Sequence, residues 1–302
     1  MISTRRGFIS AGMVYGWLLG AASASAADVH LQASVPIAGQ SWTVPVAPNA
    51  EIGLAWIPPG TFMMGSLPNE PGRKADESPQ TEVTLSQGFW LGKNFVTIGV
   101  WKAVMGTGVR DHLIKKISDD TVHDLAGKKT NLRDLMHWSP AADPATYLAN
   151  ETDDLPMYFV SWDDAKEFCA KLNERELAAG RLPDGYAFDL PTEAQWEYAC
   201  RAGSTEATYV GPSDDSSLKQ IAWYAANSAE NYQGRALGPT RSGPRAVGQK
   251  QPNSHGIYDM YGNLWQWCRD WYGPYPVGDL IDPVGPATGS EKVNRGGSWG
   301  SA

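Results

Sequence analysis

Glycine and proline interrupt this chain so often that long periodic segments cannot form. The 302 residues include 32 Gly and 21 Pro, and both residue types tend to end helices and strands. The 13 Trp and 12 Tyr residues supply bulky side chains that can anchor loops against a core. The composition therefore predicts one irregular, loop-rich α+β domain rather than two smaller ones.

Two segments carry clear helix signals. Residues Ser161 to Asp164 form a capping box, and apolar residues then recur with a helical period until Gly180. A second capping box begins at Thr192, and we expect Gly203 at the C-terminal cap of that helix. One face of each helix is predicted to be buried.

Short strands are predicted at Gly53–Ile57, Glu82–Leu85 and Phe89–Lys93, because Pro and Gly turns separate these apolar pieces. Residues 102–153 differ from the rest of the chain in composition, with many Asp and Lys residues. We expect this segment to be a family-specific addition to the domain, called the elaboration below.

The same elaboration holds three of the five histidines, His112, His123 and His137. Their spacing of 11 and 14 residues matches no compact metal site, and no HExxH motif accompanies them. We predict that these histidines lie on the surface.

The N-terminus reads as an export signal. Arg5 and Arg6 precede an apolar run over residues 11–22, and small residues at 24–26 suit a signal peptidase. A membrane anchor is the alternative, but the run is shorter than the roughly 20 apolar residues that a span requires. We expect residues 1–27 to be a twin-arginine signal peptide and the protein to be periplasmic.

The net charge argues against a protein that binds nucleic acid or anionic lipid, and the cysteine spacing argues against a disulfide-rich or zinc-binding protein. The formal net charge is -8, and loss of residues 1–27 would make it more negative, so affinity for nucleic acid or anionic lipid is not expected. Cys169, Cys200 and Cys268 lack CxxC spacing and indicate neither a disulfide framework nor a zinc site. Buried free cysteines are expected, although one bridge remains open.

Five motif-like segments follow one another along the chain: residues 56–66 (WIPPGTFMMGS), 160–165 (VSWDDA), 190–199 (LPTEAQWEYA), 253–267 (NSHGIYDMYGNLWQW) and 295–299 (RGGSW). Together they resemble the sulfatase-modifying-factor (formylglycine-generating enzyme) family. They cover about residues 50–302 apart from the elaboration. The resemblance implies an irregular formylglycine-generating-enzyme-like fold, related to C-type lectins, with little regular secondary structure.

The resemblance also implies a structural calcium site. It assigns as ligands the side chains of Asp259 and Gln266 and the carbonyl groups of Gly262 and Leu264. Gln266 stands where the family usually has glutamate, which removes a formal charge and should weaken binding. A second family site would begin at Asn227 and Ser228, but residues 234–241 offer no acid, so calcium is not expected there.

The family's active-site pocket maps onto Trp265 and Ser298, which we carry over as candidate catalytic residues. The authentic enzymes have two copper-binding cysteines, three and eight residues after the Gly-Gly-Ser serine. The first position is Ser301 here, and the second lies beyond Ala302. Family members continue well past this motif, which indicates a fragment or a shortened variant. A hydroxyl cannot replace a thiolate as a soft copper ligand, so the redox metal is unknown and the copper-thiolate site is predicted to be absent.

Three functions are compatible with the sequence. The first is oxidative maturation of a periplasmic product such as a siderophore precursor, because family members without the cysteine pair include a pyoverdine-maturation protein. The second is a non-catalytic carbohydrate- or peptide-binding module, and the third is residual formylglycine-generating activity on sulfatases. A small-molecule or peptide substrate is expected in each case.

Overall fold

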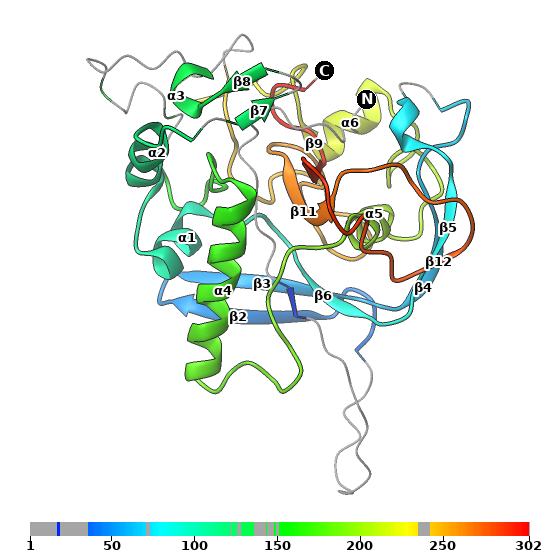
Figure 1. Cartoon of the computed structure of the whole chain (residues 1–302), viewed down its shortest axis with the longest axis horizontal. Helices are drawn as coiled ribbons and strands as arrows, with labels where there is room; N and C mark the ends of the chain where they lie inside the picture. Colours follow the sequence, from blue (N-terminus) through cyan, green and yellow to red (C-terminus); the bar gives the residue numbers. More distant parts are fainter. Residues whose placement is uncertain are drawn as a thin grey trace, which may run out of the picture.

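An antiparallel sheet carries the N-terminal part of the described chain. The computed structural model describes residues 17–18, 36–70, 73–121, 123–125, 128–135, 143, 148, 151–234 and 242–301. The strand order in this sheet is β1 (Trp17–Leu18), β6 (Phe89–Gly92), β3 (Ala50–Ile57), β2 (Ser41–Ala47). Figure 1 shows β2 and β3 at the foot of the molecule. The strands predicted at Gly53–Ile57 and Phe89–Lys93 are confirmed as β3 and β6, although β6 ends one residue earlier, at Gly92.

A second sheet has the order β12 (Leu280–Ile281), β5 (Thr81–Leu85), β4 (Gly60–Met64). The β4–β5 pair is antiparallel, whereas β12 joins β5 in parallel from much later in the chain. The strand predicted over Glu82–Leu85 is confirmed as β5. The short 3₁₀ helix η1 (Ala75–Glu77) lies in the connection between β4 and β5.

Three two-stranded ladders complete the described strands. A parallel pair joins β9 (Ala222–Trp223) to β10 (Tyr261–Gly262), and antiparallel pairs join β11 (Gln266–Trp271) to β13 (Lys292–Arg295) and β7 (His123–Leu125) to β8 (Lys128–Thr130). Short ladders of this kind agree with the predicted loop-rich α+β class.

The two predicted helices form as α4 (Trp162–Ala178) and α5 (Glu193–Arg201), and both capping boxes are made. The prediction for the end of α5 was wrong by one residue. Ala202 takes the left-handed cap conformation, with φ of 47°, and its N–H bonds the Tyr198 carbonyl. Gly203 follows with φ of 89°. The hydrogen bond from the Ala202 N–H to the Tyr198 carbonyl stabilises the cap, although a left-handed cap residue is usually glycine.

Four further helices carry weaker signals in the sequence. Thr97 caps α1 (Ile98–Met105), which ends at left-handed Gly106. The others are α2 (Val109–Ile117), α3 (Leu132–Leu135) and α6 (Asp215–Ile221).

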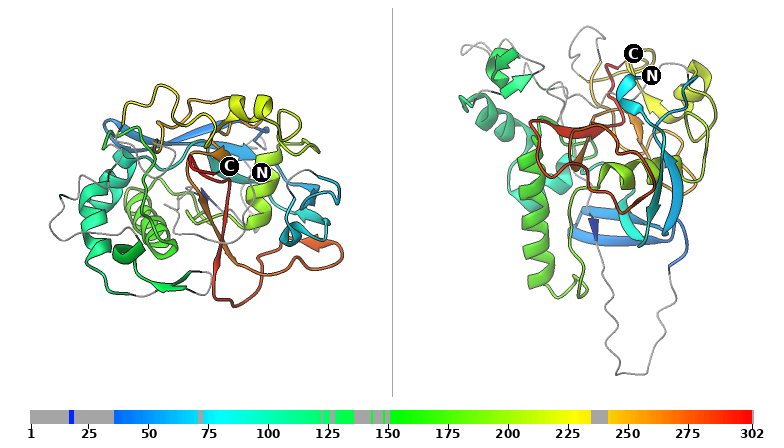
Figure 2. Two further views of the ribbon diagram at one scale, coloured as in Figure 1. Left: turned by 90° about the horizontal axis from the view of Figure 1, so that it is seen from above. Right: turned by 45° about the vertical axis from the view of Figure 1, so that its right-hand side comes forward.

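The core has two large parts. The first lies where α1, α2 and α4 pack on β2 and β3, and includes the stacked rings of Trp101 and Phe168, with centroids 5.4 Å apart. The second lies among β4, β5, β6, α5, β11 and β13, and includes Trp196 and Val293. Seen from above, the α1–α2–α4 side and the β4–β5–β12 side lie apart, with α5 between them (Figure 2).

The predicted elaboration contains α2, α3 and the β7–β8 hairpin. The expected surface position of His112 is wrong, because α2 turns its ring toward α4, where it is 5% exposed. Its Nε2 lies 3.0 Å from the Phe159 carbonyl and 3.7 Å from Asp164 Oδ2. The side chain of His123 and all of His137 lie outside the described residues.

Of the predicted signal segment, the structure describes Trp17 and Leu18, which pair with Leu91 and Trp90 of β6. Arg5, Arg6 and the expected cleavage region lie outside the described residues, so export stays a prediction. Within the described parts of the chain, no helix combines the length and apolarity needed to cross a bilayer.

Candidate functional site

A buried network of charges holds the segment that precedes the Gly-Gly-Ser turn. Arg295, at the end of β13, donates to Glu193 Oε1 and Glu197 Oε2, both at 2.9 Å. Glu193 and Glu197 are four residues apart on α5, so one helix face presents both carboxylates. All three side chains are less than 10% exposed. The network therefore fixes the position of the backbone at Arg295, from which the Gly-Gly-Ser turn starts.

Each charge in this network is compensated. Burial alone would raise the pKa of Glu197, but the charges of Arg201 and Arg295 hold that pKa below its ordinary value. Glu197 Oε1 also accepts from the backbone N–H of Gly65 at 2.9 Å, and Tyr275 donates to Glu193 Oε1 at 3.0 Å. Segments 56–66, 190–199 and 295–299 meet here for this reason.

The two candidate catalytic residues lie on neighbouring backbone segments. The β11–β13 ladder pairs Gln266 with Arg295, and it continues beyond the strands through the bond from Trp299 N–H to the Asn263 carbonyl (2.8 Å). The N–H of Gly262 also donates to the Gly296 carbonyl at 2.7 Å, so the backbone on either side of Trp265 is bonded to the segment that contains Ser298. The structure thus brings Trp265 and Ser298 to one region, and their catalytic role stays a prediction.

Glycine is required where these segments meet. Gly262 has φ of 73°, and a Cβ there would lie 2.2 Å from the carbonyl oxygen of Trp223. Gly296 has φ of 91°, and a Cβ there would lie 2.9 Å from Gln266 Nε2. Both positions need a left-handed backbone and a missing side chain.

A hydroxyl closes the turn that follows. Ser301 Oγ accepts from the backbone N–H of Ser298 at 2.9 Å, and the N–H of Ser301 donates to the Ser298 carbonyl at 3.0 Å. The Ser301 carbonyl accepts from Ala225 N–H at 2.9 Å. At the position that the resemblance gives to the first cysteine, the structure therefore has a hydroxyl engaged in the backbone of a turn.

The Asp259 carboxylate fits a cation. Its Oδ2 accepts from Gly248 N–H at 2.8 Å, whereas its buried Oδ1 has no hydrogen-bond partner among the described residues. Burial raises the pKa of Asp259 to about 6, against smaller lowering effects of Gly248 and Asn263. A positive charge beside Oδ1 would offset that cost of burial.

Gln266 does not fit the same cation in this arrangement. Its Oε1 accepts from Trp196 Nε1 at 2.5 Å, and its Nε2 donates to the Asp259 carbonyl at 2.7 Å. An indole can only donate, so the amide oxygen must face Trp196 and the amide nitrogen must face the loop. Of the predicted calcium ligands, Asp259 keeps a free oxygen and Gln266 does not, while Gly262 and Leu264 follow in the same turn.

Arg245 supplies a positive charge at the family's second cation position. Its Nε and Nη2 lie 3.2 and 2.7 Å from the Ser228 carbonyl. Both ends of the Asn227 amide are used within its own turn, by the Tyr224 N–H and the Ala222 carbonyl. Asn227 and Ser228 do not fit a metal ion, because the Arg245 guanidinium already donates hydrogen bonds to the Ser228 carbonyl. Arg245 was not among the predicted site residues, because Arg245 and Ser228 are 17 positions apart and no sequence motif links them.

All three cysteines are buried and free, as expected. Burial raises the pKa of the Cys200 thiol to about 12 and that of Cys169 further. Thiols of this kind are inert at neutral pH. Within the described residues, no group of three or more His, Cys, Asp and Glu side chains could hold a metal ion.

Comparison with known proteins agrees with this geometry. The formylglycine-generating enzyme of Streptomyces coelicolor is 29% identical over 276 residues, which are 83% of this chain and 80% of that protein. Among solved structures, Treponema denticola variable protein 1 has a TM-score of 0.59 at 23% identity, covering 89% of this chain and 90% of its own. PvdO from Pseudomonas aeruginosa has a TM-score of 0.58 at 23% identity, covering 89% of each chain. At 23% identity, these two similarities show that this chain shares their fold, and nothing beyond the fold.

The family match covers nearly all of the described core. Residues 43–302 match the sulfatase-modifying factor enzyme 1-like domain, which includes every predicted ligand and pocket residue discussed above. The chain therefore belongs to the sulfatase-modifying factor enzyme family.

Proposed function

We propose that this protein is an exported member of the family that acts in the oxidative maturation of a periplasmic product, such as a siderophore precursor of the pyoverdine type. The observation that carries the proposal is the Ser301 hydroxyl, which is bonded to Ser298 N–H at the place of the first family cysteine. A family fold with a changed group at this place supports a retained pocket with different chemistry.

The chemistry differs because no thiolate is available at Ser301. A hydroxyl is a poor ligand for copper and is not redox active, so it cannot take over the role of the family's cysteine. The three cysteines of the chain are buried elsewhere, and the raised pKa of the Cys200 thiol keeps it protonated. Residual formylglycine-generating activity is for this reason the less favoured function.

The proposed site uses an aromatic wall and polar backbone groups. Trp265 is partly exposed and lies on the segment beside Ser298, so its ring can hold a flat substrate group against the turn. An easily oxidised group of the substrate, such as a catechol or a partly reduced ring, would lose two electrons and two protons to an external acceptor such as dioxygen. The product would be two hydrogens lighter than its precursor.

The resemblance to family members that mature siderophore precursors supports this class of substrate. The fold similarity to PvdO agrees with it, without showing what this chain acts on. The same resemblance supports the proposed structural calcium ion, with Asp259 as its charged ligand.

The test is the intact mass of exported products from cells with and without the gene. A product that accumulates two hydrogens heavier in the deletion strain supports the proposal. Trp265→Ala should cause the same accumulation while the protein stays folded and exported, and Trp265→Phe, which keeps an aromatic wall, should restore the product. Ser301→Ala should leave the product unchanged.

A binding module would give a different result. Trp265→Ala would then weaken ligand binding without any change in product mass, and the maturation role would be excluded. Sulfatase-activating turnover by Ser301→Cys alone would also count against the proposed chemistry.

A further inference from the structure

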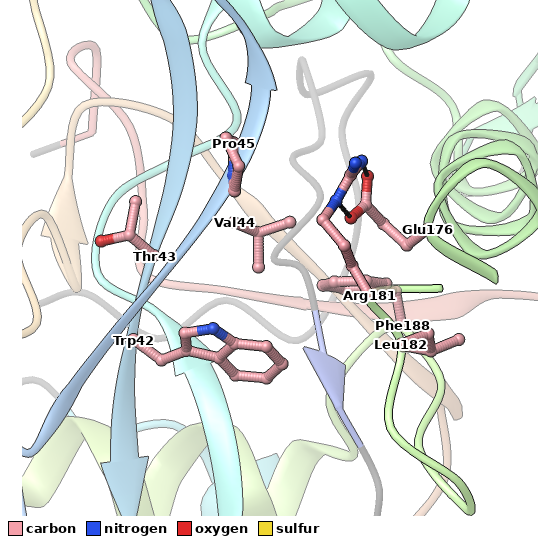
Figure 3. Close-up of a pocket in the computed structure, with 8 residues that line it drawn as sticks. All are labelled: Trp42, Thr43, Val44, Pro45, Glu176, Arg181, Leu182 and Phe188. Carbon is pink, nitrogen blue, oxygen red and sulfur yellow. Dashed lines mark hydrogen bonds and ion pairs between the residues drawn. The ribbon is translucent and has the colours of Figure 1, made fainter. Parts of the chain in front are cut away.

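A cavity of about 220 Å³ opens beside β2 and the C-terminal end of α4. The elements that line it, β2 and α4, are at the lower left in Figure 1, whereas the C-terminal end of the chain is marked near the top. Figure 3 shows β2 side chains on one side of it and the segment after α4 on the other. The lining residues are Trp42, Thr43, Val44, Pro45, Glu176, Arg181, Leu182 and Phe188.

The walls of the cavity are mostly apolar and held in place. Strand alternation in β2 turns Trp42 and Val44 to the same face of the sheet. Trp42 packs edge-on against Trp90, with ring centroids 5.7 Å apart, and Phe188 is buried behind the opposite wall. A ligand would therefore enter a preformed site, which lowers the ordering cost of binding.

One end of the cavity is polar and carries an excess of positive charge. The buried Glu176 carboxylate accepts from Arg181 Nε and Nη2, both at 2.7 Å, and Arg175 Nε lies 3.7 Å from the same carboxylate. Two guanidinium groups thus surround one carboxylate, in a protein whose net charge is strongly negative. The partial negative charge at the end of α4, about half an elementary charge, cancels only part of this excess.

The cavity offers unpaired hydrogen-bond donors, whereas the one carboxylate among its lining residues is already paired. Arg181 Nη1 and the indole N–H of Trp42 have no partner among the residues that the structure describes. Both oxygens of Glu176 are already occupied by Arg181. The Arg181 side chain is 42% exposed, so its free Nη1 is open to a ligand from solvent.

We propose that this cavity binds a small carboxylic acid with a compact apolar body, its carboxylate at Arg181 and its body between Trp42, Val44 and Leu182. The volume corresponds to roughly seven water molecules in the liquid, at about 30 Å³ each, which suits an acid of the size of benzoate. The site is separate from the one proposed for maturation chemistry.

Calorimetric titration of the folded full chain with benzoate tests the proposal, with benzamide as a neutral ligand of the same shape. Saturable one-site binding of benzoate is expected, with benzamide at least about tenfold weaker because it lacks the charge. Val44→Phe should fill the cavity and abolish binding.

Arg181→Gln should weaken benzoate binding by about tenfold or more, the fold-change of one hydrogen bond to a charged group. Lys171→Gln is the matched control, because Lys171 is a partly exposed cation on α4 that pairs with Glu167 at 3.0 Å and does not line the cavity. Its benzoate affinity should equal that of the unchanged protein. Circular dichroism identifies any variant that fails to fold. If Arg181→Gln does not fold, the comparison of benzoate with benzamide and the Val44→Phe variant still test whether the cavity binds a carboxylate.

Three results would overturn the proposal. They are the absence of saturable benzoate binding, equal affinity for benzoate and benzamide, and unchanged binding by folded Val44→Phe.

Discussion

The carbonyl oxygen of Ser228 lies 2.7 Å from Nη2 and 3.2 Å from Nε of Arg245. The same guanidinium also donates to the Glu230 carbonyl, and its centre lies 4.4 Å from the ring of Trp223. A side chain of the protein thus provides the positive charge at carbonyl groups where other family members have a second cation. This loop should hold its shape without a metal ion.

We therefore expect Arg245→Gln to lower the free energy of unfolding by about 1–3 kcal/mol, since the carbonyl group of the buried Ser228 loses its charged donor. Urea unfolding measures the change. Arg110→Gln is the control, because Arg110 pairs with Glu151 on the surface and should contribute less than about 1 kcal/mol. Equal effects of the two substitutions would show that Arg245 has no special role.

Arg295→Met should be among the most destabilising single changes, by about 3–5 kcal/mol, because it leaves Glu193 and Glu197 buried without their shared cation. The double variant Arg295→Met/Glu197→Gln should be less destabilised than the sum of its single changes. Thermal unfolding of the three variants checks this. Strict additivity would contradict the network.

Calcium added to metal-stripped protein should raise the melting temperature, because a ligand that binds only the folded state stabilises it. Asp259→Ala should abolish the increase, since it removes the unpaired Oδ1. Gln266→Glu should strengthen calcium binding by restoring a charged oxygen ligand. If calcium leaves the melting temperature of the unchanged protein as it is, the site is ruled out.

Asp270 should make stability depend on pH. Burial, and then the nearby charge of Glu193, raise its pKa to about 7, compared with about 3.9 in the unfolded chain. The folded state binds more protons between these values, so the free energy of unfolding falls as pH rises from about 4 to 7.

Asp270→Asn removes this titration and can still accept the 3.0 Å bond from Glu193 N–H. The variant should match the unchanged protein near pH 4 and exceed it at pH 8, by on the order of 2–4 kcal/mol. Parallel urea unfolding at several pH values gives the difference. A constant difference across the range would show that Asp270 does not titrate in this window.

Export should depend on both N-terminal arginines. Replacing Arg5 and Arg6 by lysine is expected to trap the precursor in the cytoplasm, because the twin-arginine receptor reads the pair. Cell fractionation and immunoblotting measure the distribution. Normal periplasmic accumulation of the double-lysine variant would refute the export prediction.

The sequence determined the elements whose signals are local. Both capping boxes formed as predicted, because the N-cap and the third helical residue lie within one turn and bond each other whatever the rest of the chain does. The strands around Gly53–Ile57 and Glu82–Leu85 also formed, since their apolar runs end at fixed turn residues. The ordered motifs were sufficient to indicate the family.

Tertiary structure decided the contacts between distant segments. Arg245 is 17 residues from Ser228, and Arg295 is 102 residues from Glu193, so only the path of the chain brings each pair together. His112 shows the same limit, because a polar residue reads as exposed until its helix is packed against α4. The cavity at Arg181 likewise arises only where β2 meets the segment after α4, since its walls come from parts of the chain with no local pattern in common.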